Sequence, residues 1–569
     1  MSFMVTFTID GRELTVPAGT TILQAAHAHD IRIPHYCYHP GLSIAGNCRI
    51  CLVDVEKFPK PAIACNTFVS EGMVVHTQEE SEKARDWQRA MMEFLLINHP
   101  LDCPIYDQAG ECKLQDYSYK LGAPTTRFVE EKEHGPKRRE LGPHVVFDWE
   151  RCIKCTRCIR FCDEVSGTSE LDMFLRGVHE EIGVFPGRPL DNPYSGNVVD
   201  ICPVGALTLR ESRFAPRVYF LSDVPSTCGA CARGCSVNLG TYRNEIVRIN
   251  PRENQAVNRW WMCDEGRLQA ARLARTGARR LSGPRGGREG AADPWRAATA
   301  AAADALAGAA RAGRVRVLAS SRASVEECYL LAKLAAGPLR GAPLHLPAHE
   351  RGEDDALLIR KDRTPNRVGA EAVFDALNVP ARPAEELERT LVSGNLSALL
   401  AIGPGMLGPI DDEPPVVSPD SLASLETLVV LDAFPSVLSE AAHVLLPTTT
   451  FAESAGTWVN FAGRVQATAR ALTPNEECRP AVMLLSDLLE RLTGEPAPGR
   501  EAIQERLSEE VPAFAGIAWA ELPASSGQQL AGSDEQAAAC APTGAALKML
   551  DAGWEKVPDS PRGKPPWVW

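Results

Sequence analysis

Residues 152–162 read Cys-Ile-Lys-Cys-Thr-Arg-Cys-Ile-Arg-Phe-Cys, and this stretch decides how the chain is organised. Three thiolates at C-x2-C-x2-C spacing can take three corners of a [4Fe–4S] cubane, and a distant Cys before Pro supplies the fourth. Cys202 precedes Pro203 and meets that requirement. The predicted cluster ligands are Cys152, Cys155, Cys158 and Cys202.

Cys162 would serve a second cluster if another C-x2-C-x2-C were present, but the sequence has none. We therefore interpret Cys162 as a buried thiol outside the cluster. Four cations, Arg151, Lys154, Arg157 and Arg160, are interleaved with the ligands. Cations near a negatively charged cubane raise its reduction potential, which is one interpretation of these side chains. The other, with equal weight, is that they form a solvated basic face.

Two further thiol quartets lie on either side of this run. The first has the spacing C-x10-C-x2-C-x13-C and comprises Cys37, Cys48, Cys51 and Cys65. Four thiolates from one loop and a following strand can enclose a [2Fe–2S] cluster, although zinc would also accept four thiolates. The second comprises Cys228, Cys231, Cys235 and Cys263, with glycines that allow a tight loop. Three complete sets in one chain favour iron–sulfur clusters and electron transfer over zinc.

A fourth motif is incomplete. His99, Cys103 and Cys112 supply three candidate ligands, and Tyr106 lies between the two cysteines. Histidine replaces cysteine at some clusters, so the surrounding quartets favour a cluster here over a structural loop.

Size and composition exclude several classes of protein. The chain has 569 residues and a formal net charge of −13, which argues against nucleic-acid binding. No apolar run reaches the roughly 18 residues that cross a bilayer, and Asp10 and Glu13 come too early for a signal peptide. We expect a cytoplasmic protein whose closely spaced thiols bind metal rather than form disulfides.

The sequence predicts several domains. Residues 1–78 have the strand and helix pattern of a small α+β module, and 79–98 form an amphipathic helix. Beyond 276, short apolar runs alternate with helices, which predicts a parallel sheet covered on both faces. Gly403, Gly405 and Gly408 match G-x-G-x-x-G, but the following PIDDEPP cannot open a phosphate-binding helix, so we predict neither a nucleotide site nor catalytic residues. Residues 523–569 are expected to form a flexible tail.

The order of these motifs resembles one known family. CxYHPGL…GNCRICLV, NHPLDCPIYDQAGECKLQD and CIKCTRCIRFCDE…CPVGALT, followed by C-x2-C-x3-C…C, are similar to the family of large iron–sulfur subunits of bacterial respiratory complex I, NADH:quinone oxidoreductase. The resemblance covers nearly all of the first 265 residues. The stretch SEAAHVLLPTTTFAESAGTWVNFAGRVQ at 439–466 is similar to a molybdopterin-oxidoreductase domain in shortened form.

The resemblance implies a multidomain α+β and α/β fold. Its expected parts are a β-grasp, ferredoxin-like [2Fe–2S] domain at 1–78, a helical His–Cys cluster segment at 79–119 and a ferredoxin-like [4Fe–4S] domain at 120–220. A [4Fe–4S] molybdopterin-oxidoreductase N-terminal domain at 221–275 and a truncated α/β domain of the same kind at 276–522 follow.

The resemblance also implies a function. The chain would carry electrons, without bond chemistry of its own, from a subunit that binds FMN and NADH toward quinone-side iron–sulfur subunits, and the assembly would couple this transfer to proton translocation. It implies one [2Fe–2S] cluster, two or three [4Fe–4S] clusters, no molybdopterin, and a place in the peripheral arm at the inner face of the cell membrane. Membrane contact would come only through the complex.

In that family the His–Cys cubane has the pattern H-x3-C-x2-C-x5-C, and Tyr106 occupies the position of its middle cysteine. Three outcomes stay open: a cubane whose fourth iron has another ligand, a [3Fe–4S] cluster, or no cluster. We favour a retained cluster with altered ligation.

Two other classes share parts of this pattern. The large subunit of an NAD-linked formate dehydrogenase would need a molybdenum ligand among Cys328, Cys478 and Cys540, and an iron-only hydrogenase would need further clustered cysteines. A non-redox scaffold is the third alternative, and it would lack stoichiometric iron.

Overall fold

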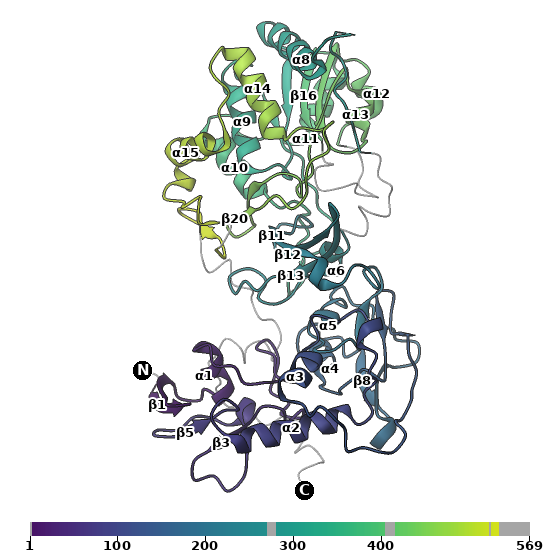
Figure 1. The fold of residues 1–569 in the computed structure, drawn as a ribbon. Coiled ribbons are helices and arrows are strands. Elements are labelled where there is room, and N and C mark those ends of the chain that lie inside the picture. Colours follow the sequence, from purple (N-terminus) through teal and green to yellow (C-terminus); the bar gives the residue numbers. More distant parts are fainter. Residues whose placement is uncertain (1–2, 270–279, 289, 404–415, 523–524, 534–569) are drawn as a thin grey trace. The chain divides into compact units, whose positions relative to one another are not determined.

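The computed structural model describes residues 3–269, 280–288, 290–403, 416–522 and 525–533. The described chain forms two compact units, one containing Met1–Phe220 and one formed by Leu221–Ala541 (Figure 1). The division falls where the sequence predicts a domain boundary, between residues 220 and 221.

The first module of the N-terminal unit is a five-stranded sheet with one helix. The strand order is β2-β1-β5-β3-β4, with β1 antiparallel to β2 and parallel to β5. Asp10 and Gly11 have positive φ and form the tight turn between the first two strands. The elements are β1 (Met4–Ile9), β2 (Arg12–Pro17), α1 (Ile22–Ala28), β3 (Leu52–Val55), β4 (Ala62–Ile63) and β5 (Val74–His76). The expected small α+β module is confirmed.

A helical segment follows this module. Helix α2 (Glu82–Leu96) begins after Ser81, whose hydroxyl accepts a hydrogen bond from the Ala84 amide. Its buried side of Ala84, Gln88 and Met92 contacts β3 and α3 (Lys113–Leu121). The amphipathic pattern therefore predicted this helix correctly and two to three residues too long at each end.

The last part of the N-terminal unit is built from short elements around loops. Strand β7 (Val145–Phe147) lies between β10 (Leu207–Leu209) and β6 (Arg139–Glu140). Two short helices, α4 (Arg157–Glu164) and α5 (Asn197–Asp200), and the hairpin of β8 (Leu171–Phe174) and β9 (Glu181–Val184) complete it. Single 3-10 turns occur at η1 (Ala64–Asn66), η2 (Cys103–Ile105), η3 (Gly177–His179) and η4 (Val218–Phe220).

The second unit begins with an antiparallel meander. Its strands are β11 (Ser222–Thr227), β12 (Ser236–Tyr242) and β13 (Glu245–Pro251), and the short helix α6 (Asp264–Arg267) follows. This meander carries the loops of the third thiol quartet.

The centre of the second unit is the predicted parallel sheet. All neighbours in the order β15-β14-β16-β17-β18 are parallel. Its strands are β14 (Val315–Leu318), β15 (Leu344–His345), β16 (Ala398–Ile402), β17 (Thr427–Asp432) and β18 (Val444–Pro447).

Successive residues of these strands point to opposite faces, and both faces are buried. Leu400 and Val429 belong to one apolar core, while Leu399 and Val430 belong to another. Helices contributing to the first core are α8 (Pro294–Arg311), α9 (Val325–Ala336), α10 (Arg367–Ala376), α14 (Ala481–Thr493) and α15 (Arg500–Glu510). Those contributing to the second are α11 (Ala384–Val392), α12 (Pro419–Leu422) and α13 (Val437–Ala441). Coverage of both faces explains why the strands read as continuous apolar runs.

Helix α9 begins with a capping box. The Ser324 hydroxyl accepts from the Glu327 amide, and the Glu327 carboxylate accepts from the Ser324 amide. Of the G-x-G-x-x-G pattern only Gly403 is described, and Gly405 and Gly408 lie outside the described residues.

Residues 525–533 are the described part of the segment predicted as a flexible tail at 523–569, and they pack against the rest of the second unit. The other residues of that segment lie outside the described residues. Strand β21 (Gln528–Gln529) pairs with β20 (Arg464–Thr468), which pairs with β19 (Gly456–Val459), and Leu530 is buried. The turn η6 (Pro512–Phe514) leads into this region. The composition bias hid this pairing because backbone hydrogen bonds, not side chains, hold the edge strand.

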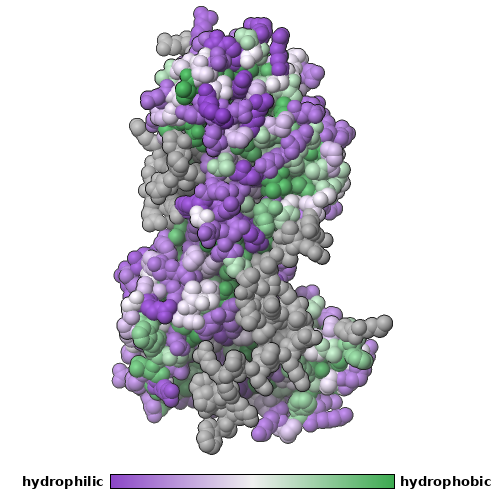
Figure 2. All heavy atoms as spheres, turned by 180° about the vertical axis from the view of Figure 1, so that it is seen from behind, coloured by the Kyte–Doolittle hydropathy of each residue, from purple (hydrophilic) through white to green (hydrophobic). Residues whose placement is uncertain are grey.

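Surface properties are mixed. Hydrophilic and hydrophobic side chains are interspersed on the face shown in Figure 2. Within the described residues, every helix is too short or too polar to span a bilayer.

Candidate functional site: four cysteine-rich centres

The first quartet lies in the N-terminal module. Cys37 and Cys48 come from the long loop after α1, Cys51 precedes β3, and Cys65 lies in η1. All four thiols are buried. The loop turns through Gly46 and Arg49, both with positive φ, which brings the thiol at 48 back toward Cys37.

The four thiols form a continuous group. The Cys37 amide donates to the Cys48 sulfur at 3.4 Å. Hydrogen bonds from the Cys48 and Cys65 thiols lower the pKa of Cys37 to about 2, outweighing burial, and Cys65 also contacts Cys51 and lowers its pKa. The same thiol–thiol hydrogen bonds, together with burial, raise the pKa of Cys48 and Cys65, so the four thiols interact as one group.

The second quartet surrounds the start of α4. Lys154 and Thr156, between the ligands, have positive φ, and the Lys154 amide donates to the Cys152 sulfur at 3.4 Å. Burial raises the pKa of Cys158, and the charges of Cys155, Cys152 and Cys202 raise it further. The structure therefore brings these four thiols together, as the sequence predicted. Burial therefore favours the neutral form of the Cys158 thiol.

The structure also shows the burial of Cys162 and of two of the cations that are interleaved with the predicted ligands. Cys162 is fully buried on α4, in agreement with a packing role. Arg151 and Arg157 are also buried, so the alternative of a solvated basic face is wrong for these two cations.

The third quartet lies beside the meander. The Cys228 amide donates to the Cys235 carbonyl oxygen at 2.8 Å, and Gly234 has a φ of 59° that closes the loop. Burial raises the pKa of Cys235, with further contributions from Cys228, Cys231 and Cys263. A Cβ at Gly266 would lie 2.6 Å from the Cys228 sulfur. The sequence analysis missed Gly266, although it lies three residues after a predicted ligand.

The fourth centre lies between η2 and α3. Burial lowers the pKa of His99 to about 4, so its imidazole is neutral and able to bind a metal. Burial and the neighbouring Cys112 raise the pKa of Cys103. The thiols of Cys103 and Cys112 therefore lie beside the ring of Tyr106. Tyr106 and Cys112 are buried.

Tyr106 does not provide a thiolate-like ligand. Burial raises its pKa, and a hydrogen bond with Cys112 raises it further, so the phenol stays neutral. Its ring fills space beside the loop of Cys202, because a Cβ at Gly205 would lie 2.1 Å from the Tyr106 ring. The residues at this centre fit three ligands and do not fit a cubane with four.

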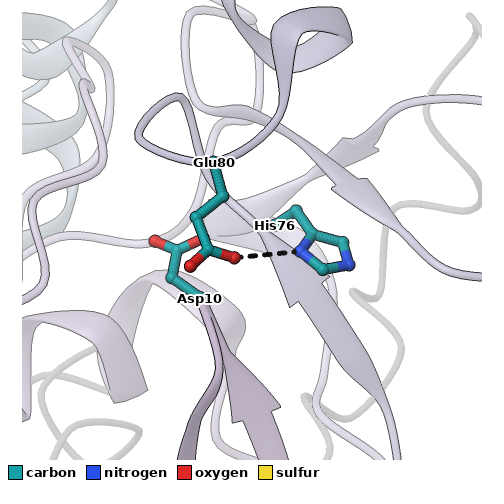
Figure 3. A group of neighbouring side chains, drawn as sticks. All are labelled: Asp10, His76 and Glu80. Atoms are coloured by element: carbon teal, nitrogen blue, oxygen red, sulfur yellow. Dashed lines mark ion pairs between the residues drawn. The ribbon is translucent and has the colours of Figure 1, made fainter.

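One further group was not predicted. Asp10, His76 and Glu80 meet at the edge of the first module, and Figure 3 shows the two acidic side chains beside the imidazole. The distance from His76 Nδ1 to Glu80 Oε2 is 3.5 Å, and His76 Nε2 lies 3.3 Å from Glu56 Oε1. Asp10 accepts hydrogen bonds from the amide and hydroxyl of Thr77. Asp10 is far from His76 and Glu80 in the sequence, so no spacing of residues points to the three together.

Thiol chemistry across the described chain agrees with metal binding. All described cysteines carry free thiols, including Cys328 and Cys478.

Family models match five segments of the chain. They are a 2Fe-2S iron-sulfur cluster binding domain at 2–80, an NADH-ubiquinone oxidoreductase-G iron-sulfur binding region at 88–127 and a ferredoxin-like domain of NADH-quinone oxidoreductase subunit 3 at 142–208. A molybdopterin oxidoreductase Fe4S4 domain matches 221–274, and a molybdopterin oxidoreductase domain matches 395–491. The expected order of domain types is therefore confirmed.

Curated proteins similar to this chain are named as G subunits of NADH-quinone oxidoreductase. The chain is 42% identical over 344 residues to the NADH-quinone oxidoreductase G subunit of Mycobacterium bovis and 44% identical over 266 residues to that of Rickettsia bellii. These alignments cover 58% and 47% of this chain, and 41% and 38% of the relatives. The matched part thus spans less than half the length of the curated relatives. A chain of a NAD+-reducing [NiFe]-hydrogenase in the H2-reduced state is 29% identical over 38% of this chain and 91% of that one, with a TM-score of 0.34.

Proposed function

We propose that this chain, which is homologous to the G subunits of NADH-quinone oxidoreductases, is an iron–sulfur electron-transfer component of such a complex. It would pass electrons from a partner that oxidises NADH toward quinone, and the assembly would couple this transfer to proton translocation. The observation that carries the proposal is the presence of three thiol quartets in one chain, with ten of the twelve cysteines buried and Cys152 and Cys202 partly exposed.

The proposed cofactors follow from the thiol sets. The first quartet would hold a [2Fe–2S] cluster, and the other two quartets would each hold a [4Fe–4S] cluster. Such clusters exchange single electrons, and the protein holds them in place, keeps water away and adjusts their potentials through hydrogen bonds and nearby charges. We assign no catalytic residue to this chain.

The centre at His99, Cys103 and Cys112 would hold a [3Fe–4S] cluster. Three protein ligands are available, and the neutral Tyr106 phenol donates to Cys112 rather than replacing a thiolate. Surrounding cations support an anionic occupant, since the charges of Lys132, Arg151 and Lys137 all act on His99.

The domain similar to molybdopterin oxidoreductases would bind no molybdenum. Cys328 is fully buried inside α9, away from any loop that could present it to a metal. Cys478 is also buried, and its thiol donates to the Leu281 carbonyl oxygen at 3.3 Å. Molybdenum in the purified protein would instead support a catalytic enzyme of the formate dehydrogenase class.

Partners would bind the N-terminal unit. Leu101 and Ile105 flank Cys103 and are 77% and 70% exposed, and Tyr119 on α3 is 84% exposed. Exposed large apolar side chains beside a redox centre favour a protein partner there. We place the chain in the peripheral arm of the complex, at the inner face of the cell membrane, with other subunits making the membrane contact.

The test is a count of clusters. Protein purified without oxygen is analysed for iron, acid-labile sulfide and molybdenum, and the reduced and oxidised forms are examined by low-temperature electron paramagnetic resonance (EPR). The proposal expects one [2Fe–2S] signal and two [4Fe–4S] signals in the reduced protein, one [3Fe–4S] signal in the oxidised protein, and no molybdenum. A protein without stoichiometric iron would be a scaffold, and the proposal would then be wrong.

A further inference from the structure

Two arginines of α4 reach from the second quartet to the first. Arg160 donates through Nη2 to the Cys37 carbonyl oxygen at 2.6 Å and to the Cys155 carbonyl oxygen at 3.4 Å. It also donates to the Ser43 carbonyl oxygen. A single guanidinium therefore bridges the backbones of two predicted ligands that belong to different clusters.

Arg157 makes a second bridge of the same kind. It donates to the carbonyl oxygen of Tyr38, next to Cys37, and at 3.0 Å to that of Ile201, next to Cys202. Arg157 is 4% exposed, and its Nε is buried without a hydrogen-bond partner among the described atoms. A buried cation with a free N–H beside thiols fits anionic clusters on both sides.

Other contacts hold the same two loops together. Glu164, one turn after Arg160, accepts from the amide and hydroxyl of Ser43, with a distance of 2.8 Å to the amide. The Asn47 side-chain amide donates to the Lys154 carbonyl oxygen at 3.2 Å. The loop that carries Cys37 and Cys48 is thus fixed against the loop that carries Cys152 and Cys155.

We propose that Arg157 and Arg160 are positioning residues for electron transfer between the [2Fe–2S] and [4Fe–4S] clusters of this unit, and that their charges raise both reduction potentials. This inference rests on the proposed function. The transfer moves one electron and no proton, so oxidation of one cluster is reduction of the other. The arginines would fix the distance between the clusters by bridging rigid backbone groups.

The physical argument has two parts. Electron tunnelling depends steeply on distance, so contacts that hold two ligand loops in one geometry control the rate. Reduction adds negative charge to each cluster, and a buried cation between them stabilises both reduced forms. Arginine suits this place because its planar fork donates to several carbonyl oxygens while it stays charged.

The experiment compares Arg160→Gln, Arg160→Lys and Arg157→Gln with the matched control Arg176→Gln, which removes an exposed cation from the same unit. Potentials of both clusters are measured by redox titration followed by EPR, and the magnetic interaction between the two reduced clusters reports their separation. Arg160→Gln should lower both equilibrium constants for reduction by up to about tenfold, or about 59 mV for one electron. Arg160→Lys should leave the reduction potentials of both clusters close to their wild-type values. It should change the magnetic interaction between the two reduced clusters.

The outcomes separate this inference from the proposed function. If Arg160→Gln keeps both clusters and both potentials, or shifts only one, the bridging role is wrong while the clusters stand. If the wild-type protein lacks the clusters, the proposed function fails as well. If Arg157→Gln fails to fold, the Arg160 variants test the proposal by themselves. Arg160 is only half-buried, so its variants leave the interior of α4 intact.

Discussion

Arg151 lies over the ring of Tyr106, with its guanidinium carbon 5.0 Å from the ring centroid. The same guanidinium donates to Asp102, with 2.6 Å between Nη2 and Oδ2. Asp102 precedes Cys103 and Arg151 precedes Cys152, so this contact joins the incomplete centre to the second quartet. A neutral phenol under a cation is stabilised by about 0.5–2 kcal/mol, which favours the ring as a packing element rather than a ligand.

Tyr106→Cys should add one iron per chain. The new thiolate would complete a set of one histidine and three cysteines, so the oxidised-state EPR signal of a [3Fe–4S] cluster should disappear and a further [4Fe–4S] signal should appear on reduction. Iron analysis and EPR check this. Tyr106→Phe is the control, because it removes the hydroxyl without adding a ligand. An increase of four irons instead of one would mean that the wild-type centre is empty.

Cys155→Ser should remove one [4Fe–4S] cluster, because a buried serine hydroxyl is a poor replacement for thiolate. Iron should fall by about four per chain, and the [2Fe–2S] signal should persist. Cys162→Ala is the matched control, from the same helix region and equally buried. A loss of cluster in Cys162→Ala would show that Cys162 is a ligand and that its assignment as a packing residue is wrong.

Gly266→Ala should remove the third cluster selectively. The added methyl would lie 2.6 Å from the Cys228 sulfur, closer than atoms can approach, so the thiol must move out of ligand geometry. EPR should lose one [4Fe–4S] signal while the other signals stay. Gly499→Ala, in the same unit with no atom within 4 Å of the new methyl, should have no effect on any cluster. If Gly266→Ala kept all the [4Fe–4S] signals of the wild type, the third cluster would not be bound beside Gly266.

Stability of the first module should fall as the pH rises through the pKa of His76. Burial alone would lower this pKa, but hydrogen bonds with Glu56 and Glu80 outweigh it and raise the pKa above its ordinary value of 6.5. The protonated form is thus favoured in the folded state, so the stabilisation is fully present below about pH 6.5 and is lost above the raised value.

The measurement for His76 is urea denaturation from pH 5.5 to 8.5, followed by the visible absorbance of the [2Fe–2S] cluster. His76→Gln should lose about 0.2–1 kcal/mol at the acid end and nothing at the alkaline end, since the ion pairs of this partly exposed side chain are screened by water. Glu80→Gln should reduce the pH dependence without abolishing it. An identical pH dependence in wild type and His76→Gln would contradict the ion-pair account.

Much of the local architecture followed from the sequence. The amphipathic α2 and a parallel sheet covered on both faces were predicted, because hydrophobic periodicity acts within a few residues. The short pairing of Gln528–Gln529 with β20 was not, because edge pairing depends on a partner strand about sixty residues away.

The sequence by itself determined which residues are the candidate cluster ligands, because a cluster needs thiolates at spacings that the chain shows directly. Tertiary structure alone decided their surroundings. It joined Arg160 to the carbonyl oxygen of Cys37 across 123 residues, set Tyr106 against Gly205, and brought Asp10 beside His76. The physical reason is that such contacts form only when separate segments close on one another, so their partners have no fixed separation along the chain.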